Sequence, residues 1–560
     1  MTGDTISREL KYDVLIIGGG GAAGRGAIAS ASAGAKTLVV LKKKLGASGA
    51  TTHKCCEIAG FNVPGCGDTN DTRETYLKDI LDAALNMAKP ELAGLLADNA
   101  KDRFEELRAW GVHPAEDNGK PIVMKGCYSN YRRGYTIKGH GEPIMHALIA
   151  QMQKLGVDIM EESMAVDLLM SGNRCCGALV LDENDRLVLV RAKATILATG
   201  GASRVFLNNL NPGDVSGDGY SLAYDNGAEL MNMEFMQAGI GFFYPAKSLF
   251  NTYLWAGFPK LMNRSGEAFL QKYLPEGISE KDVMLMHCQH FPFSSKDISK
   301  YLEIGIQKEL EAGGGTERMC VPVSFRHFTD EYIASLEYDA DLKQLWPLVK
   351  SHFAQQGIDI VNDDIEITCV AQAINGGILI DSSAQSSVEG LFAAGETAAG
   401  PHGADRLGGN MMGTCQVFGA IAGRCAAEYA GKTDFVPCSY DLDGSLMLAV
   451  LHKNVPVEEL TLELQKNAQT KLFICRTEEK LLDMLDKIAE LKKRLIGAED
   501  TDKLYRGNLE LYHKLNAAYV MTVAAEQRKE SRGSHYREDY PEIKEEFSSP
   551  IVIKRTGIKL

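Results

Sequence analysis

The sequence predicts an α/β protein with three parts: a nucleotide-binding domain assembled from two separated stretches of chain, an α+β domain inserted between them, and a helical C-terminal domain. Three observations indicate this arrangement. Apolar, strand-like runs far apart in the chain each end in glycine and other small residues. A stretch rich in proline, aromatic and charged residues separates two of these runs, and the C-terminal part has helical periodicity.

The first apolar run, YDVLIIGGGGAAG, ends in a glycine-rich turn between Gly18 and Gly24. It fits the G-x-G-x-x-G/A pattern of a Rossmann-like domain, in which a strand, a tight turn and a helix N-terminus receive a pyrophosphate. An alanine-rich helix and a second run, TLVVL, complete a βαβ unit. Lys42 follows that run where an acidic residue would normally accept the ribose hydroxyls of NAD, so NAD is disfavoured.

Two later runs repeat the pattern of a strand that ends in small residues. ATILATGGA ends at Thr199 to Ala202, and GLFAAGETAAG turns at Gly395. Such ends meet at the ligand edge of one sheet, which predicts a discontinuous Rossmann-like domain in two pieces. After it, apolar residues recur every three or four positions between Asn467 and Gln527, as in packed amphipathic helices. The expected parts are the nucleotide-binding domain at 1–235 and 369–440, the inserted domain at 236–368, and the helical domain at 441–560.

Composition and charge limit the class of protein. With 560 residues and 45% hydrophobic content, the chain is long enough for two or three domains. The net charge of −14 is spread along the chain, which argues against a nucleic-acid surface and a polybasic membrane patch. No signal-peptide pattern and no membrane-spanning run is visible, which predicts a cytoplasmic protein. The 13 cysteines have no C-x-x-C spacing, so neither a metal site nor an internal iron–sulfur cluster is predicted.

Several longer segments give the sequence a resemblance to a known family. They are GGGGAAG, ILATGGASRVF, SGDGYSLAYDNGAELMNMEF, INGGI, GLFAAGETAAGPHGADRLGGN and KESRGSHYREDYP. With them the chain resembles the flavoproteins of succinate dehydrogenase, fumarate reductase and L-aspartate oxidase, and more distantly the adenylylsulfate reductase α subunit. The resemblance implies an FAD-binding domain, a mobile capping domain between its halves, a C-terminal helical domain, and a substrate held between cap and flavin.

The resemblance also implies which residues line the FAD. In many members a histidine is bonded to the flavin, but Gly49 stands at that position here, so we expect non-covalent FAD, with His53 as the nearest histidine. For Asp218 an Asx turn within SGDG is an equally good interpretation. The expected cofactor-binding residues are Gly18, Gly20, Gly21, Ala22, Ala23, Lys42, Lys43, Ser48, Gly49, Thr51, Ala198, Thr199, Gly200, Asp218, Glu396, Arg406, Asn410, Met411 and Met412.

The sequence departs from the family where fumarate would bind. The M-E-F-x-Q-F-H-P-T run has Gly239 in place of histidine, the R-G-E-G-G run of the cap has no match, and Gln372 replaces the histidine of H-Y-x-M-G-G-I. His402 and Arg406 remain. Arg406 can grip one anion in bidentate fashion, but the partners of a second carboxylate and the usual proton source are missing. A dicarboxylate substrate is therefore not expected.

The sequence thus predicts an FAD-dependent oxidoreductase that moves hydride between flavin N5 and an activated alkene, or its saturated form, other than fumarate or succinate. Arg406, His402 and Gln372 are the expected catalytic residues, with a proton from an unidentified residue of the cap. Arg406 as a structural tie between cap and flavin domain is the alternative. An aromatic pocket formed by Phe242, Phe243, Tyr244 and Trp255, with Lys260 or Arg264 supplying charge, is expected to bind substrate.

Three other functions stay open at this point. The chain could be the catalytic subunit of a complex with a separate iron–sulfur protein, a sulfur-compound reductase like adenylylsulfate reductase, or an FAD-binding sensor without activity. Because no cluster cysteines are present, electrons are expected from an external donor: an iron–sulfur protein, a flavin protein or a small reductant.

Overall fold

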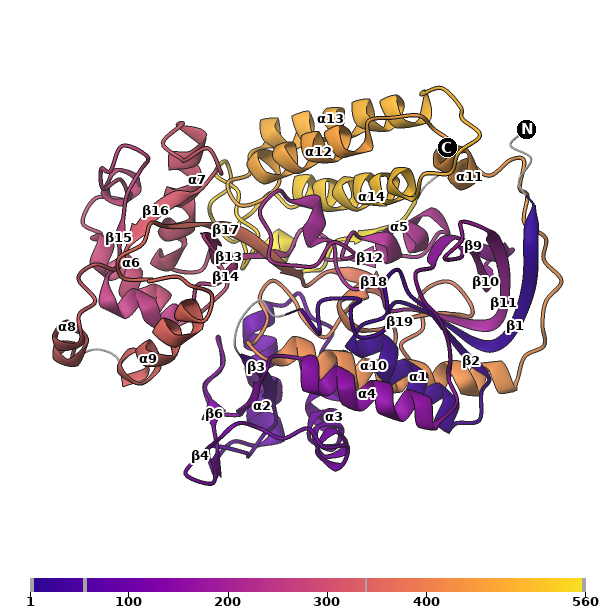
Figure 1. The fold of residues 1–560 in the computed structure, drawn as a ribbon, viewed down its shortest axis with the longest axis horizontal. Helices are drawn as coiled ribbons and strands as arrows, with labels where there is room; N and C mark the ends of the chain where they lie inside the picture. Colours follow the sequence, from indigo (N-terminus) through magenta and orange to yellow (C-terminus); the bar gives the residue numbers. More distant parts are fainter. Residues whose placement is uncertain (1–4, 54–57, 338–339, 556–560) are drawn as a thin grey trace.

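The computed structural model describes residues 5–53, 58–337 and 340–555, and its main sheet has seven strands (Figure 1). Its order is β8-β2-β1-β11-β10-β9, and β19 pairs with β11. The strands β1, β2, β11 and β19 are parallel, so their carboxyl ends lie at one edge. The prediction that separated glycine-ended runs share one sheet is thereby confirmed. The bounds are β1 (Ile6–Ile17), β2 (Thr37–Val40), β8 (Asp158–Met160), β9 (Met164–Ser171), β10 (Arg174–Leu181), β11 (Leu187–Leu197) and β19 (Leu391–Ala393).

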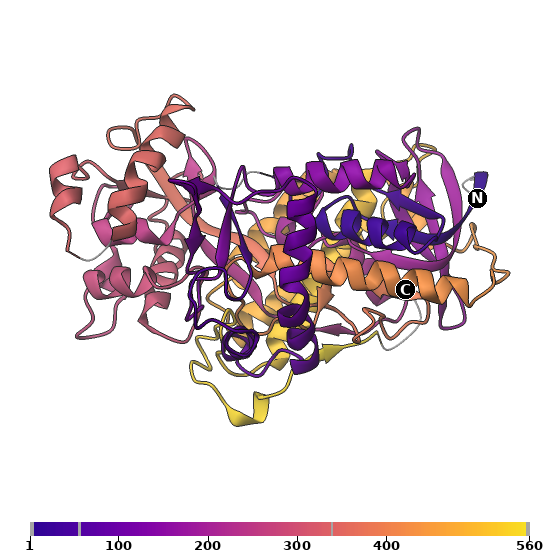
Figure 2. The same cartoon turned by 90° about the horizontal axis from the view of Figure 1, so that it is seen from below.

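Helices α1 (Gly21–Ser32) and α10 (Asn410–Gly431) lie side by side along the sheet, as the indigo and orange helices of Figure 2 show. Glycines allow this contact between backbones. A Cβ at Gly423 would lie 2.2 Å from the carbonyl oxygen of Gly26, and one at Gly419 would lie 2.8 Å from that of Ala22. This close packing joins the first and last parts of the nucleotide-binding sheet. Other helices of this part are α2 (Arg73–Ala84), α3 (Pro90–Ala109), α4 (Glu142–Lys154) and α5 (Asp218–Asp225).

The inserted domain forms the lobe at the left of Figure 1. Strand β13 (Met236–Tyr244) leads into it, and β17 (Ile365–Ile374) leads back, pairing with β13 in antiparallel fashion. Because β13 and β17 begin and end beside the nucleotide-binding sheet, they join the lobe to the expected site. The remaining elements are β14 (Ser248–Leu249), β15 (Lys260–Leu261), β16 (Val321–Ser324), α6 (Glu280–His287), α7 (Tyr301–Glu311), α8 (Asp330–Ser335) and α9 (Ala340–Ala354).

Four helices make up the C-terminal part, at the top of Figure 1. Every apolar residue that α13 buries, from Leu481 to Leu495, follows three- and four-residue spacing, whereas α14 is buried over most of its surface. Helix α14 packs against both α13 and α5, so it links the helical domain to the nucleotide-binding domain. The bounds are α11 (Leu446–Leu451), α12 (Val457–Lys471), α13 (Glu478–Ile496) and α14 (Arg506–Gln527).

Small sheets complete the fold. Strand β12 joins β18 to β21, so the end of the described chain returns to the segment before the cap. In the described part of the chain, every helix is too short or too polar to cross a membrane. The small strands are β3 (Ile58–Asn62), β4 (Glu116–Asp117), β5 (Lys120–Pro121), β6 (Val123–Met124), β7 (Gly134–Lys138), β12 (Leu230–Met231), β18 (Gly377–Leu379), β20 (Ala398–Ala399) and β21 (Val552–Ile553).

Candidate active site

The glycine-rich turn after β1 brings backbone close to backbone. Gly18 has φ +132°, and a Cβ there would lie 2.1 Å from the carbonyl oxygen of Ala198, so only glycine lets the ends of β1 and β11 meet. Helix α1 starts after Gly20, and no side chain in the described chain caps it. The Gly21 N–H donates to Thr51 Oγ1 at 3.0 Å. The Gly18 N–H donates to the Val40 carbonyl at 2.9 Å and the Gly24 N–H to the Gly20 carbonyl at 3.0 Å. The N–H groups of Ala22 and Ala23, in the first turn of α1, can donate to an anion such as a pyrophosphate.

The loop after β2 is fixed by a buried carboxylate that the sequence motifs do not reveal. Asp214 Oδ2 accepts bonds from Ser48 Oγ and the Gly49 N–H, both at 2.8 Å, and Lys43 Nζ lies 3.2 Å from its Oδ1. Burial opposes ionisation of Asp214, but these donors and the nearby Lys42 hold the pKa of its carboxyl below the ordinary value. A single aspartate in a proline- and glycine-rich segment gives no local signal for this role, because its partners lie far away in the chain.

Lys42 does not extend into solvent. Its Nζ lies 2.8 Å from Asp218 Oδ2, 2.7 Å from Ser216 Oγ and 3.2 Å from Glu510 Oε1. Asp218 is the first residue of α5. Burial alone would raise the pKa of its carboxyl, but the Lys42 ammonium lowers it by more, so the net shift is downward. The Asx-turn interpretation therefore misses the main partner of this side chain, which is Lys42.

The ends of β11 and β19 are cross-linked by threonines and face Glu396. Thr397 Oγ1 accepts from the Gly200 N–H at 2.9 Å, and Thr199 Oγ1 accepts from the Gly219 N–H at 3.1 Å. Glu396 Oε1 accepts from the Ile374 N–H at 3.0 Å. Burial raises the pKa of the Glu396 carboxyl to about 7. The Glu396 carboxyl thus accepts a hydrogen bond and is only partly ionised near neutral pH.

Asn410 is the first residue of α10, and in the described chain only the oxygen of its side-chain amide has hydrogen-bond partners. Its Oδ1 accepts from Asn62 Nδ2 at 2.6 Å and from the Tyr76 hydroxyl at 2.7 Å, whereas its Nδ2 is buried without a partner in the described chain. Met411 and Met412, which follow it, are half-buried. The amide donor of Asn410 is therefore available to a ligand at the start of this helix.

Buried polar atoms without a hydrogen-bond partner recur around this place in the described chain. Buried polar groups are normally satisfied, so such a set indicates a missing polar ligand. Together with the glycine-rich turn at α1, this set fits a flavin nucleotide and a substrate above it. The atoms are Gln237 Nε2, Gln372 Oε1, Asn375 Nδ2 and Oδ1, His402 Nδ1, Asn410 Nδ2 and Gln416 Oε1.

The buried guanidinium of Arg406 has one side-chain partner. Its Nε and Nη2 both donate to Gln237 Oε1, at 3.0 and 2.8 Å, and its Nη1 donates to the Leu407 carbonyl at 3.4 Å. Among the residues that the structure describes, Arg406 makes no ion pair. His402 donates or accepts one bond with Thr414 Oγ1 at 2.8 Å. Burial, and then Arg406, lower the pKa of His402 well below its ordinary value, so the ring is neutral.

The cap residue Phe291 occupies the space beside Gly239. A Cβ at Gly239 would lie 2.0 Å from Phe291 Cζ, so no larger residue fits there while Phe291 keeps its place. The backbone of the same cap segment is anchored on both sides: the Phe291 N–H donates to Cys127 Sγ at 3.1 Å, and the Phe293 N–H donates to the Ala238 carbonyl at 2.8 Å. The cap segment therefore packs an aromatic ring against strand β13 at Gly239.

This cap segment also carries a cation that no sequence motif singles out. Lys296 Nζ lies 4.2 Å from the centroid of the Tyr128 ring, and its side chain is exposed. Nearby, Ser294 Oγ donates to Asp405 Oδ2 at 2.7 Å. Burial raises the pKa of the Asp405 carboxyl to about 6, with Lys296 and His290 acting against that shift. Lys296 thus lies at the seam between the cap and the segment that holds Arg406.

Two of the four rings expected to form an aromatic pocket, Trp255 and Phe242, lie in the core of the cap instead. Trp255 and Phe242 are at most 2% exposed and pack with Phe250 in the core of the cap, so these rings stabilise the cap and cannot receive a substrate. Tyr244 lies at the end of β13, 37% exposed, with the Arg318 guanidinium 3.9 Å from its ring centroid. Arg264 is exposed in a turn of the cap. These apolar rings are covered by the core of the cap, so they are not free to form a ligand surface.

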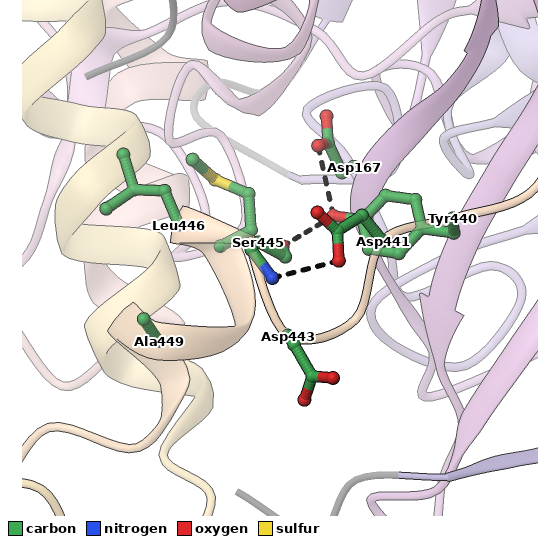
Figure 3. Close-up of a pocket in the computed structure, with 9 residues that line it drawn as sticks. Asp167, Tyr440, Asp441, Asp443, Ser445, Leu446 and Ala449 are labelled. Carbon is green, nitrogen blue, oxygen red and sulfur yellow. Dashed lines mark hydrogen bonds between the residues drawn. The ribbon is translucent and has the colours of Figure 1, made fainter. Parts of the chain in front are cut away.

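A hollow of about 440 Å³ lies away from these residues, between β9 and α11 (Figure 3). There the Tyr440 hydroxyl bonds Asp167 Oδ2 at 3.1 Å and Ser445 Oγ at 2.7 Å. None of the expected cofactor or substrate residues lines it. We interpret this hollow as part of the junction between the nucleotide-binding and helical domains.

Comparison with known proteins identifies related chains over the whole length. The FAD binding domain family matches residues 13–412, and the fumarate reductase flavoprotein C-terminal family matches residues 461–555. An uncharacterized FAD-dependent oxidoreductase of Methanocaldococcus jannaschii is 32% identical over 97% of this chain and 96% of its own. A fumarate reductase (CoM/CoB) subunit of Methanothermobacter marburgensis is 30% identical over 98% of both chains. The solved structure of Mycobacterium smegmatis Sdh1 in complex with UQ1 superposes with TM-score 0.83 at 25% identity, covering 99% of this chain and 96% of that one.

Proposed function

The chain belongs to the FAD-dependent flavoprotein family of fumarate reductase and succinate dehydrogenase, and from this premise we propose that its substrate is an activated alkene with one carboxylate or carbonyl, or the saturated form of such a compound. The protein is an FAD-dependent oxidoreductase. Bound FAD supplies a hydride donor and acceptor at N5. Fumarate and succinate are not the proposed substrates.

Arg406 is the observation that carries this proposal. A buried guanidinium whose only side-chain partner in the described chain is a neutral amide is costly, and an anionic ligand would complete its bonding. Glu396 offers little compensation, because burial raises its pKa to about 7. One carboxylate or carbonyl oxygen of a substrate can bond Arg406, and neutral His402 can bond the same group through Nδ1, which has no partner among the described residues. Together these groups would polarise the substrate.

The other end of the site supports a single anchored group. The Phe291 ring fills the volume next to Gly239, and Gln372 is neutral. A second carboxylate would meet an aromatic ring and an amide there, which cannot replace its hydration as a cation would. This is why we propose a monocarboxylate or a carbonyl compound in place of a four-carbon diacid.

We assign the proton to Lys296. Reduction of an activated alkene needs hydride at one carbon and a proton at the adjacent carbon. Lys296 lies on the cap segment next to the Arg406 segment, with its ammonium over the Tyr128 ring, and this exposed ammonium can be reprotonated from water. In the direction of alkene formation the same amine would accept the proton.

The proposal is tested by the return of oxidised-flavin absorbance. Holoprotein reduced with dithionite is mixed, without oxygen, with fumarate, with enoates that carry one carboxylate, and with enones. We expect reoxidation by at least one monocarboxylate or enone and none by fumarate. Rapid reoxidation by fumarate would contradict the substrate class, and no reoxidation by any compound would contradict the activity.

The electron donor is a second part of the proposal. The relative from Methanothermobacter marburgensis is named as one subunit of a fumarate reductase, which favours a separate protein partner for this chain as well. We propose that an iron–sulfur or flavin protein delivers electrons. Purification of the tagged protein from its native host should then yield a second, coloured polypeptide in constant ratio. A chain that is purified alone and reduced at full rate by a small thiol or nicotinamide would argue against it.

A further inference from the structure

The adenosine end of the FAD site lies where the helical domain touches the sheet. In a dinucleotide-binding unit the residue that follows the second strand contacts the adenosine ribose, and here that residue is Lys42. Its ammonium bonds Asp218 of α5 and Glu510 of α14. Because Glu510 belongs to the C-terminal helical domain, that domain reaches the adenosine end directly, and Figure 1 shows α14 lying against α5 there.

His513 lies on α14 one turn beyond Glu510. Its side chain is 0% exposed, and neither ring nitrogen has a hydrogen-bond partner in the described chain. The charged groups close enough to shift its pKa are Asp218, Lys42, Glu510 and, more weakly, Asp167, so His513 lies near the Lys42 cluster. Burial lowers the pKa of His513, which leaves a neutral imidazole with one N–H donor and one acceptor. An imidazole that is buried with both nitrogens unsatisfied is costly unless a ligand bonds it.

The packing of α14 fixes this ring in place. Ala517, one turn further along, stands so close to Gly217 that a Cβ there would lie 2.6 Å from the Cβ of Ala517. Asn516 Nδ2 donates to Ser221 Oγ at 2.8 Å and to Asp225 Oδ2 at 2.9 Å. These contacts hold α14 against α5 close to His513. The ring therefore cannot find a partner by a small movement of its helix.

We propose that α14 forms the outer wall of the adenosine subsite, and that His513 hydrogen-bonds the adenosine moiety of FAD. In this arrangement Asp218 and Glu510 balance the charge of Lys42, and Lys42 holds the Asp218 carboxylate in place. That carboxylate would then accept the ribose hydroxyls in place of the acid that is missing after β2. The consequence is that the C-terminal helical domain contributes directly to the retention of FAD. This inference concerns the cofactor end and does not depend on the identity of the substrate.

The test separates a ligand contact from a packing role. In His513→Leu, a similar volume is kept and both unsatisfied nitrogens are removed. If His513 only fills space, the variant should bind FAD as the wild type does. If it bonds adenosine, we expect the FAD dissociation constant, measured by flavin fluorescence on serial dilution of the holoprotein, to rise by about tenfold or more, while the flavin-free full-length chain melts at the same or a higher temperature.

Two further variants complete the experiment. His513→Gln keeps a donor and an acceptor and should recover most of the FAD affinity. Tyr519→Phe, on the same helix next to Lys492, should leave the affinity unchanged. The proposal is overturned if His513→Leu binds FAD within twofold of wild type, or if its flavin-free form is destabilised so that weaker binding reflects misfolding. It is also overturned if ADP, which competes for the adenosine subsite, loses no affinity in a variant that binds FAD poorly.

Discussion

Phe291 and Gly239 share one volume: the aromatic ring of the cap residue stands where the side chain of any other residue at position 239 would begin, with 2.0 Å between Phe291 Cζ and an ideal Cβ. The two residues belong to different segments, a cap loop and strand β13. Their fit packs the cap loop against β13 and leaves no room for a side chain at position 239. Substitutions at this pair therefore measure how tightly the cap loop packs against the strand.

Gly239→Ala should destabilise the protein by about 1–3 kcal/mol, because an overpacked core residue forces the ring or the strand to move. The free energy of unfolding in urea measures this effect. In a chain that already carries Phe291→Ala, adding Gly239→Ala should cost much less free energy of unfolding, because the methyl group then has room. If the two changes are simply additive, the residues do not compete for space and the close fit of ring and glycine is wrong.

Arg406→Ala should lower turnover by about 10²–10³-fold with little loss of FAD, because the group that polarises the substrate is removed. Initial rates and the flavin-to-protein absorbance ratio measure the two effects. Arg424→Ala, on the exposed side of α10, is the matched control and should change neither. Unchanged turnover in Arg406→Ala would leave Arg406 as a structural tie between cap and flavin domain.

Lys296→Met should reduce turnover by about 10²-fold or more, since the proton donor is lost, while Lys296→Arg should keep part of it. The rate of reduced-flavin reoxidation by the best alkene measures this step. Lys300→Met, on the same cap segment with its ammonium bonded to the Ser295 carbonyl, serves as the control. Equal rates in Lys296→Met and the wild type would show that another group supplies the proton.

Glu396 and Asp405 should make the flavin-free protein less stable at pH 8 than at pH 5, whereas the buried histidines His402, His513 and His535 act in the opposite direction. Burial lowers the pKa of these histidines, so at pH 5 the unfolded chain binds protons that the folded chain does not. Burial raises the pKa of Glu396 to about 7 and that of Asp405 to about 6, so the folded state binds protons that the unfolded state has already released. This stabilisation is fully present below the unfolded pKa values, near ~4, and is lost as pH rises through about 6 to 7. Because the histidines oppose this loss, the contribution of one acid is measured as the difference in free energy of unfolding between a variant and the wild type at the two pH values.

Glu396→Gln isolates the contribution of one acid. The variant keeps the acceptor for the Ile374 N–H but cannot ionise, so its free energy of unfolding relative to the wild type should increase from pH 5 to pH 8. Glu428→Gln, which removes an exposed acid, should differ from the wild type by the same amount at both pH values. A Glu396→Gln variant that also differs from the wild type equally at pH 5 and pH 8 would contradict the raised pKa of Glu396.

Local patterns in the sequence were sufficient for the sheet and for the cofactor. Gly18, Gly200 and Gly395 each follow a buried apolar run, and the glycines allow a turn with positive φ or a close backbone contact that side chains would prevent. The spacing of apolar residues likewise predicted amphipathic α13. These features depend on neighbours within a few positions, so a single sequence contains all the information.

The roles of Asp214, Phe291, Lys296 and His513 came only from the folded chain. Ser48 and Asp214 are 166 residues apart, and Lys42 and Glu510 are 468 residues apart, so no local pattern connects them. The prediction that Trp255 and Phe242 line an aromatic pocket in the cap was wrong for a related reason. Hydrophobicity indicates that Trp255 avoids water, but it does not say whether a core or a ligand covers the ring.

The amino-acid sequence by itself determined that this protein is built on a glycine-ended parallel sheet that holds FAD, because strand, turn and helix signals are written in consecutive residues. Tertiary structure alone decided that Phe291 fills the space beside Gly239 and that α14 buries His513 near Lys42. Those outcomes depend on the packing of segments that are distant in the chain, where volume, burial and unpaired polar atoms become defined only after folding.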